Sequence, residues 1–130
     1  MNYIKITFGI FLALAASRFI PHPPNFTSLI ALSFYVPLFL GKRFIPALLI
    51  CFIITDIFIG FHAIVVFTWG SVIFISLTSY LFQKNIYIRI LGAVCGSLVF
   101  YIISNFGVWS LGSYGYSFDG LLVCYIAAIP

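Results

Sequence analysis

The sequence contains very little charge: only 6% of its 130 residues are charged, and just two of them are acidic. Ordinary soluble domains carry roughly a quarter of charged residues. Hydrophobic residues make up 64% of the chain, and a chain of this size must leave a large share of its area exposed. A water-soluble fold cannot hide so much apolar surface, so we expect the surrounding solvent to be lipid. The net charge of +4 does not indicate nucleic-acid binding, because the basic residues are single or paired between apolar runs.

The chain also lacks the short motifs that identify common catalytic sites. It has no P-loop and no GxGxxG sequence, so no recognisable machinery for ATP hydrolysis is present. The cysteines lie far apart in apolar runs and form no CxxC pair, which favours buried, inert thiols. These are Cys51, Cys95 and Cys124. We therefore predict that the protein is not an enzyme and needs no cofactor.

Apolar runs separated by prolines and polar turns predict an all-α protein. A helix needs about 20 apolar residues to cross a membrane, and the sequence offers five such runs and the start of a sixth. The expected helices cover approximately residues 2–19, 26–40, 44–60, 62–82 and 86–104, with a shorter run over 121–130. We expect a loop over 105–120. Residues 1–130 are thus predicted to form one domain, a polytopic transmembrane helical bundle. Its last helix is expected either to be cut short at the carboxyl end, which we favour, or to re-enter the membrane.

The basic residues predict how this bundle is oriented. If the spans alternate, five of the six lysines and arginines fall on one side of the membrane, and only Arg18 falls on the other. Because basic residues accumulate in cytoplasmic loops, we expect the amino terminus to lie in the cytoplasm. The five residues are Lys5, Lys42, Arg43, Lys84 and Arg89.

In this topology, other polar side chains collect at the outer ends of the helices. Ionisable groups inside a membrane usually face a bundle interior or a wet cavity, and they usually have partners. We therefore predict an outward-facing, substrate-binding pocket. Its candidate residues are Arg18, His22, Asn25, Asp56, His62, Asn105 and Trp109.

Asp56 is the strongest of these candidates because it follows a long apolar run. A carboxylate there needs a cation or several hydrogen-bond donors, so we predict that Asp56 pairs with Arg18 or His22. The pair either belongs to a binding site or simply ties the first and third helices together. The ligand types of His22, Asp56 and His62 suit zinc, but their spacing matches no metal-binding motif, so we predict no metal site.

The segment that follows Arg18 is rich in proline, at positions 21, 23 and 24. Non-helical backbone near a membrane is tolerated where it is buried in protein or lines a cavity. A broken segment beside a short, kinked helix points to a binding site in transporters. A stiff external turn is the alternative interpretation.

Small residues at helical spacing form two stripes that would let helices approach closely. Gly9, Ala13 and Ser17 form one on the first helix, and Gly92 and Gly96 form the other on the fifth. Packing within the bundle is the simpler interpretation, and docking to a partner subunit is the alternative.

Three segments together resemble an uncharacterised family of small bacterial membrane proteins. They are RFIPHPPNF at Arg18–Phe26, TDIFIGFH at Thr55–His62 and NFGVW at Asn105–Trp109. That family is in turn similar to the substrate-binding S components of energy-coupling factor (ECF) transporters. The resemblance implies a six-helix, S-component-like bundle in the bacterial inner membrane that captures a vitamin-like micronutrient. It also implies a transmembrane coupling subunit, contacted through Gly9, Ala13 and Ser17, and separate ATPases.

We therefore predict a membrane-embedded, substrate-binding subunit for micronutrient uptake. The alternative is a structural accessory subunit of a larger membrane complex without transport activity. The first interpretation predicts an outward-facing polar cavity, whereas the second predicts polar residues that are sealed against one another.

Overall fold

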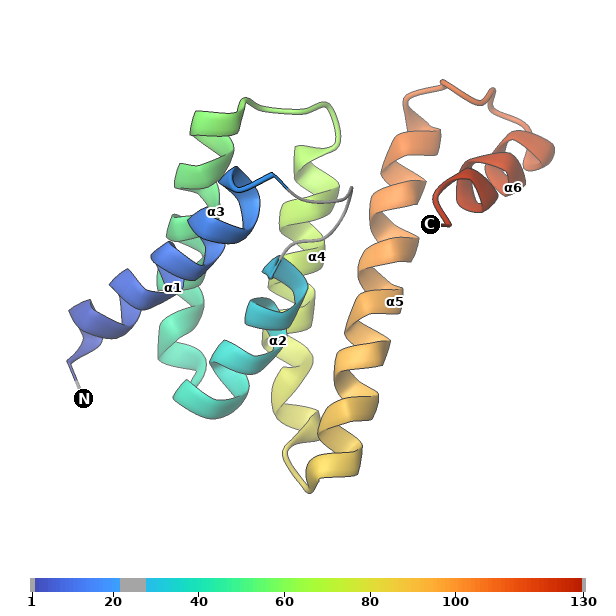
Figure 1. Cartoon of the computed structure of the whole chain (residues 1–130). Coiled ribbons are helices and arrows are strands. Elements are labelled where there is room, and N and C mark those ends of the chain that lie inside the picture. The colour runs from blue at the N-terminus through green and yellow to red at the C-terminus, as the bar shows by residue number, and fades with distance from the viewer. Residues whose placement is uncertain (1, 22–27, 130) are drawn as a thin grey trace.

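A computed structural model describes residues 2–21 and 28–129, and over these residues the regular secondary structure is entirely helical (Figure 1). This confirms the predicted all-α class. The six α-helices are α1 (Tyr3–Phe19), α2 (Leu29–Leu40), α3 (Ile45–Ile59), α4 (Val65–Thr78), α5 (Ile86–Ser110) and α6 (Phe118–Ala127). Two short 3-10 helices, η1 (Lys42–Phe44) and η2 (Ser79–Phe82), lead into α3 and extend α4.

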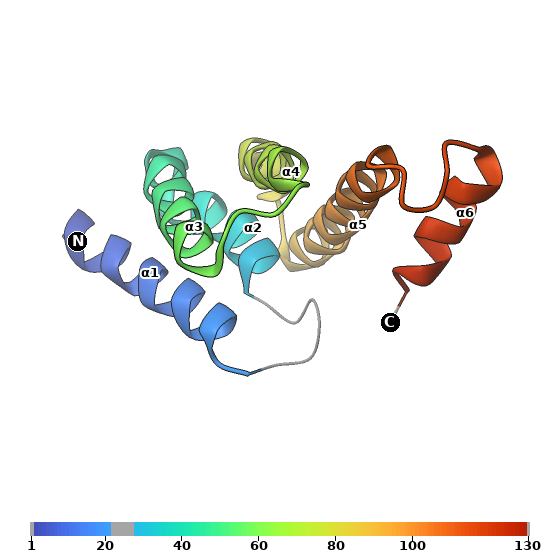
Figure 2. The ribbon, with the colours of Figure 1, turned by 90° about the horizontal axis from the view of Figure 1, so that it is seen from above.

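The short helix α2 lies at the centre of the bundle and packs against α3, α4 and α5. Helix α1 crosses α3 on the outside, α4 packs along α5, and α6 packs against α5 at the far end of the molecule (Figure 2). The α2–α3 and α4–α5 connections lie at one end of the bundle, and the α3–α4 and α5–α6 connections lie at the other (Figure 1).

Local sequence signals explain where several helices begin and end. The side chains of Asn2 and Asn85 accept hydrogen bonds from backbone amides in the first turns of α1 and α5, which satisfies donors that have no partner within the helix. Helices α2 and α3 end at Gly41 and Gly60, whose φ angles are 97° and 102°. Such positive angles are strained for residues with a side chain, so glycine sets both helix ends.

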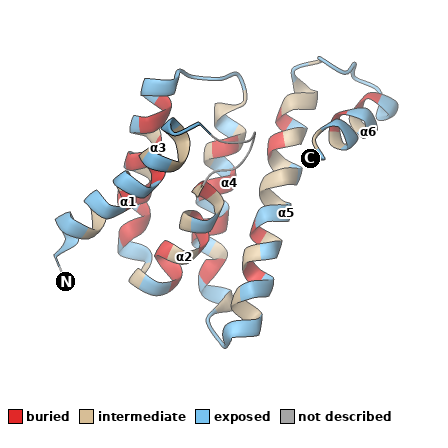
Figure 3. Ribbon diagram, in the orientation of Figure 1, coloured by how far each residue is buried: buried red, intermediate tan, exposed pale blue. Residues whose placement is uncertain are grey.

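Large side chains that are almost fully buried form the core between α1, α2, α3 and α4. Figure 3 shows this buried face and the largely exposed outer faces of the helices. The most buried large residues are Leu14, Phe34, Phe44, Leu48, Phe52, Val72 and Ile75. The molecule exposes 7968 Å², more than the about 6,900 Å² expected for a soluble monomer of this mass. Many exposed side chains are Ile, Leu, Phe and Val, which suits an apolar surrounding.

Two helices are long and apolar enough to cross a membrane, Val65–Phe82 with 18 residues and Ile86–Ser110 with 25. At about 1.5 Å per residue they extend roughly 27 and 37 Å, which compares with a hydrocarbon core of about 30 Å. Helices α1 and α3 have 17 and 15 residues, and α2 has only 12. The structure thus supports two spanning helices, and five complete spans stay a prediction.

The predicted loop over 105–120 was wrong at both ends, because α5 continues to Ser110 and α6 already begins at Phe118. The glycine, serine and tyrosine residues of this segment favour a loop when the sequence is taken alone. In the structure, the Asn105 side chain donates to the carbonyl of Tyr101 one turn earlier, at 2.8 Å. Gly107 is buried where a side chain would collide with Phe67 of α4. Gly107 is therefore a helix-packing residue, and the helix ends only near Gly112, where φ is 83°.

Candidate functional site

The centre of the candidate site is an ion pair between α1 and α3. Arg18 lies in the last turn of α1, and its Nη2 is 2.5 Å from Oδ1 of Asp56. Its Nη1 donates to the hydroxyl of Thr55 at 2.8 Å. The side chain of Asp56 is fully buried, and that of Arg18 is 12% exposed. The predicted pairing of Asp56 with Arg18 is confirmed.

A third helix reaches the same carboxylate. The indole Nε1 of Trp69, on α4, donates to Oδ2 of Asp56 at 2.7 Å. Below the pair, the guanidinium carbon of Arg18 lies 4.9 Å from the centre of the Phe52 ring. We refer to Arg18, Thr55, Asp56 and Trp69 as the polar junction. It joins α1, α3 and α4 at the end of the bundle that carries the α3–α4 connection.

Helix dipoles explain why Asp56 needs a cation at this point. Asp56 lies in the last turn of α3, and its carbonyl accepts the hydrogen bond from Gly60 that closes the helix. The carboxyl end of a helix carries partial negative charge, so an anion there is disfavoured and a cation is favoured. Arg18 lies at the carboxyl end of α1, where a cation is favoured. Its positive charge compensates the negative charge of Asp56. Besides Arg18, Oδ1 has no hydrogen-bond partner among the described residues.

Sequence reasoning did not include Trp69 or Thr55 in the site. Aromatic residues make up 20% of the chain, so an additional tryptophan in an apolar run carries little information. A usable signal was that a buried indole N–H needs an acceptor, and Asp56 is one of only two carboxylates in the sequence.

The chain matches the description "Family of unknown function (DUF6580)" over residues 2–130. It belongs to this family. A comparison with curated proteins and with solved structures finds no match to the chain. Family membership confirms the predicted resemblance to an uncharacterised family, whereas the further similarity to S components stays a prediction.

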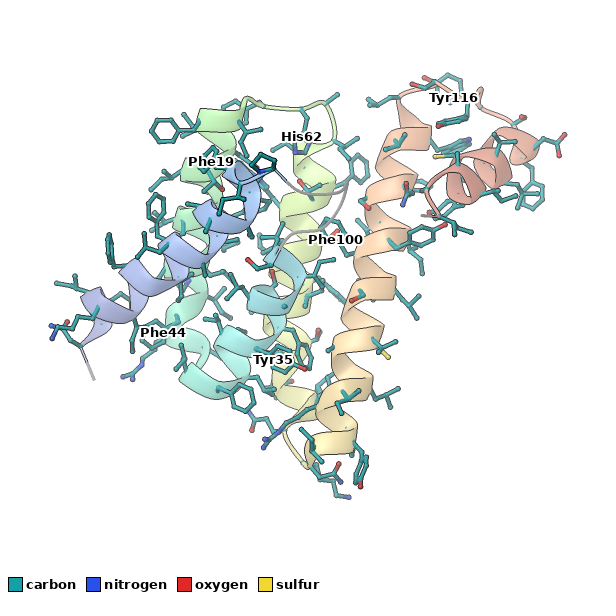
Figure 4. All side chains as sticks on the ribbon, viewed as in Figure 1. Phe19, Tyr35, Phe44, His62, Phe100 and Tyr116 are labelled. Carbon is teal, nitrogen blue, oxygen red and sulfur yellow. The ribbon has the colours of Figure 1, made fainter. Side chains whose placement is uncertain are left out.

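Of the other predicted site residues, the three that the structure describes do not join the polar junction. His62 is exposed in the connection between α3 and α4 (Figure 4). His22 and Asn25 lie outside the described residues. The side chain of Asn105 is bonded within its own helix. Trp109 packs against Phe106 and Tyr116, in the region where α5 meets the α5–α6 connection.

The environment of the Trp109 side chain is unusual for a tryptophan. Its indole nitrogen is buried and has no hydrogen-bond partner among the described residues. Nearby, the backbone carbonyl of Asn105 accepts a contact of 3.4 Å from the thiol of Cys124 on α6. The Asn105 carbonyl therefore helps to hold α6 against α5, whereas Trp109 packs against Tyr116 of the α5–α6 connection.

No group of three His, Cys, Asp or Glu side chains within the described ranges is arranged to hold a metal ion. The polar junction has one carboxylate, and its remaining polar groups are hydrogen-bond donors or a hydroxyl. This chemistry can orient a guanidinium and hold it in an apolar bundle.

The two small-residue stripes have different environments. Gly9 is exposed and has open space where a side chain would be, whereas the hydroxyl of Ser17 shares a 2.8 Å hydrogen bond with that of Ser28. The stripe on α1 is thus open near Gly9 and covered near Ser17 by the start of α2. Gly92 and Gly96 are both buried, and they face other helices of the same chain.

Proposed function

We propose that this protein is a membrane-embedded, substrate-binding subunit for uptake of a vitamin-like micronutrient. In this proposal it crosses the bacterial inner membrane several times, with its amino terminus in the cytoplasm. The observation that carries the proposal is the polar junction, where an ion pair is buried inside an apolar bundle. Such charges cost several kcal/mol each to desolvate, and ionisable residues in membrane segments commonly mark solute pathways.

The distribution of charge supports the proposed orientation. Four basic residues, Lys42, Arg43, Lys84 and Arg89, lie in or beside the α2–α3 and α4–α5 connections. We call this the basic end of the bundle (Figure 1). Arg18 lies toward the opposite end and is paired with Asp56. The positive-inside rule assigns the basic end to the cytoplasm, which would direct the polar junction outward.

Within the proposed pocket, the residues of the junction have separate roles. Arg18 keeps some exposure, whereas Asp56 has none, so Arg18 is the group that can contact a solute. A guanidinium has five N–H donors in a fixed plane, and Thr55 and Asp56 engage only some of them. Asp56 and Trp69 would act as positioning residues that hold this plane in place.

The direct test is to purify the full chain in mild detergent and identify co-purifying small molecules by mass spectrometry. A panel of vitamins is then tested by thermal shift against wild type, Arg18→Lys and the control Asp119→Asn. We expect one compound to stabilise wild type and the control, and to lose most of its effect with Arg18→Lys. Absence of any co-purified compound and of any thermal shift would count decisively against the proposal.

A structural accessory subunit remains the second candidate, and one observation favours it. Both oxygens of Asp56 already have partners from the protein, Arg18 and Trp69, as expected for a sealed internal tie. The double variant Arg18→Asp with Asp56→Arg distinguishes the candidates. If the ion pair has only a structural role, the swapped pair should restore it, with normal accumulation of the protein in the membrane and no loss of function. A binding site would regain accumulation at most, because the guanidinium would then project from α3.

The proposed coupling subunit would dock along α1 near Gly9 and Ala13, which are both exposed. Separate ATPases would act through that subunit. Replacement of Gly9 by Leu should then reduce co-purification of the partner without changing solute binding.

A further inference from the structure

A cavity with an apolar lining lies between α4 and α5 in the half of the bundle nearest the basic end. It encloses about 210 Å³. Phe74, Thr78 and Leu81 line one wall, and Gly92, Cys95 and Val99 line the other. Phe74 and Leu81 are 51% and 61% exposed, so the cavity is a groove that opens on the surface of the molecule. We refer to it as the α4–α5 groove.

The glycines of α5 let neighbouring side chains pack closely against this helix beside the groove. A side chain at Gly92 would meet Phe82 and Phe34 at about 2.5 Å, and both rings also line the groove. Gly96 faces Ile75 at ordinary contact distance. The lining residues of α5 extend from Gly92 to Val99, roughly two turns or about 10 Å at 1.5 Å per residue. This length suits part of a linear apolar chain.

Positive charge surrounds the end of the groove at η2. Arg89 donates from Nη2 to the carbonyl of Gln83, directly after η2, at 3.0 Å. The ammonium of Lys42 lies 4.0 Å from the centre of the Tyr80 ring in η2. Lys84, the residue after Gln83, is exposed. Three cations are thus grouped around the four residues of η2.

The protein supplies no carboxylate side chain for these cations. The chain has only two acidic residues: Asp56 is paired with Arg18, and Asp119 lies in the first turn of α6. The buried Nε of Arg89 also has no hydrogen-bond partner within the described part of the chain. An anion from outside the protein would balance the positive charge of these three side chains.

We propose that the α4–α5 groove and its three cations bind one phospholipid with an anionic headgroup. One acyl chain would occupy the groove, and the headgroup phosphate would lie against Lys84 and Arg89, with Lys42 nearby. Basic pockets between transmembrane helices on the cytoplasmic side bind anionic headgroups in this manner. The site is at the opposite end from the polar junction, so its occupancy does not depend on the proposed solute binding.

The experiment measures lipid retained by the purified full chain, using native mass spectrometry in detergent. Phosphatidylglycerol is compared with phosphatidylcholine of the same acyl chains. The headgroup variant is Lys84→Gln with Arg89→Gln. Lys84→Gln alone is matched by the control Lys5→Gln, which removes one charge on α1. The groove variant is Cys95→Trp, and its control is Leu98→Trp, at an exposed position of α5 outside the lining.

We expect wild type to retain phosphatidylglycerol in preference to phosphatidylcholine at one lipid per chain. Loss of each nearby basic residue should weaken binding about fivefold, and loss of both about 25-fold. Cys95→Trp should reduce retention of both lipids, whereas both controls should behave as wild type. Because Arg89→Gln also removes an internal hydrogen bond, Lys84→Gln alone is measured as well. It should still weaken phosphatidylglycerol binding about fivefold.

Four results would overturn the proposal. The first is equal retention of the two lipids by wild type. The second is an equal effect of Lys84→Gln and its charge-matched control Lys5→Gln. The third is undiminished retention by Cys95→Trp. The fourth is equally tight binding of water-soluble glycerol phosphate, since binding would then not need an acyl chain in the groove.

Discussion

Replacement of Asp56 by Asn is the most informative perturbation of the polar junction. The amide has nearly the same shape as the carboxylate, and its oxygen can still accept from Trp69. The change therefore removes the negative charge and leaves Arg18, which is only 12% exposed, without a counter-ion. Removal of one partner of a buried ion pair costs about 3–5 kcal/mol, so we expect the free energy of unfolding to fall by that amount.

A double-mutant cycle tests whether this cost arises from the pair. Arg18→Met alone should also cost about 3–5 kcal/mol, because it strands the buried carboxylate. The double variant leaves no buried ion, since a hydrophobic side chain and a neutral amide replace the pair. Its loss should fall at least about 3 kcal/mol short of the sum of the single losses, at the upper end of measured coupling energies.

The assay is equilibrium unfolding in mixed micelles, followed by tryptophan fluorescence. Trp69 contacts the carboxylate directly, so its emission reports on the junction. Asp119→Asn is the control, because Asp119 is exposed in the first turn of α6 and its helix-dipole interaction is worth about 0.3–1 kcal/mol. Additive losses within about 0.5 kcal/mol would refute the reasoning, because Arg18 and Asp56 would then be energetically independent.

Three further changes test individual contacts by equilibrium unfolding, here followed by circular dichroism because Trp69→Phe removes the fluorescent reporter of the junction. Gly92→Ala should lower the free energy of unfolding by about 1–3 kcal/mol, because the methyl group collides with two phenylalanine rings. The control Gly9→Ala lies in open space and should be neutral or stabilising. Equal effects of the two variants would contradict the described packing. Trp69→Phe should cost about 1.5–3 kcal/mol through loss of a hydrogen bond to a charged group, and the loss should vanish in the Asp56→Leu background. Asn85→Ala should cost about 1 kcal/mol by removing the cap of α5, and a smaller value for Asn85→Asp would confirm the role of the side-chain acceptor.

The sequence was sufficient for the helices because composition and helix breakers are local properties. The prolines and glycines that flank α1, α2 and α3 gave limits within about one residue at Phe19, Leu40 and Ile59. The same reasoning was wrong at Gly107, because the Phe67 ring that makes glycine necessary there comes from another helix. A residue that ends one helix and a residue that admits a neighbouring helix look alike in a sequence.

Only the charged residues of the site could be predicted from the sequence, because an ion in an apolar bundle needs a partner of opposite charge. Because charged residues are scarce in the chain, the sequence predicted that Asp56 pairs with Arg18 or His22, and the structure shows Arg18. Trp69 and Thr55 were not predictable because many apolar or small polar residues could have filled those positions. Asn105 and Trp109 were assigned to the same pocket because they share an end of the bundle, but their contacts show that they face the α5–α6 region.

The ion pair also constrains how the chain is made. Thr55, next to Asp56, follows Arg18 by 37 residues, which takes roughly 2–7 s at a synthesis rate of about 5–20 residues per second. Throughout that interval the chain has no carboxylate side chain to pair with the guanidinium, which must stay in contact with water or another polar partner. Helix α1 therefore cannot settle into its final place until α3 has emerged, so the order of synthesis and the order of assembly differ for the first helix.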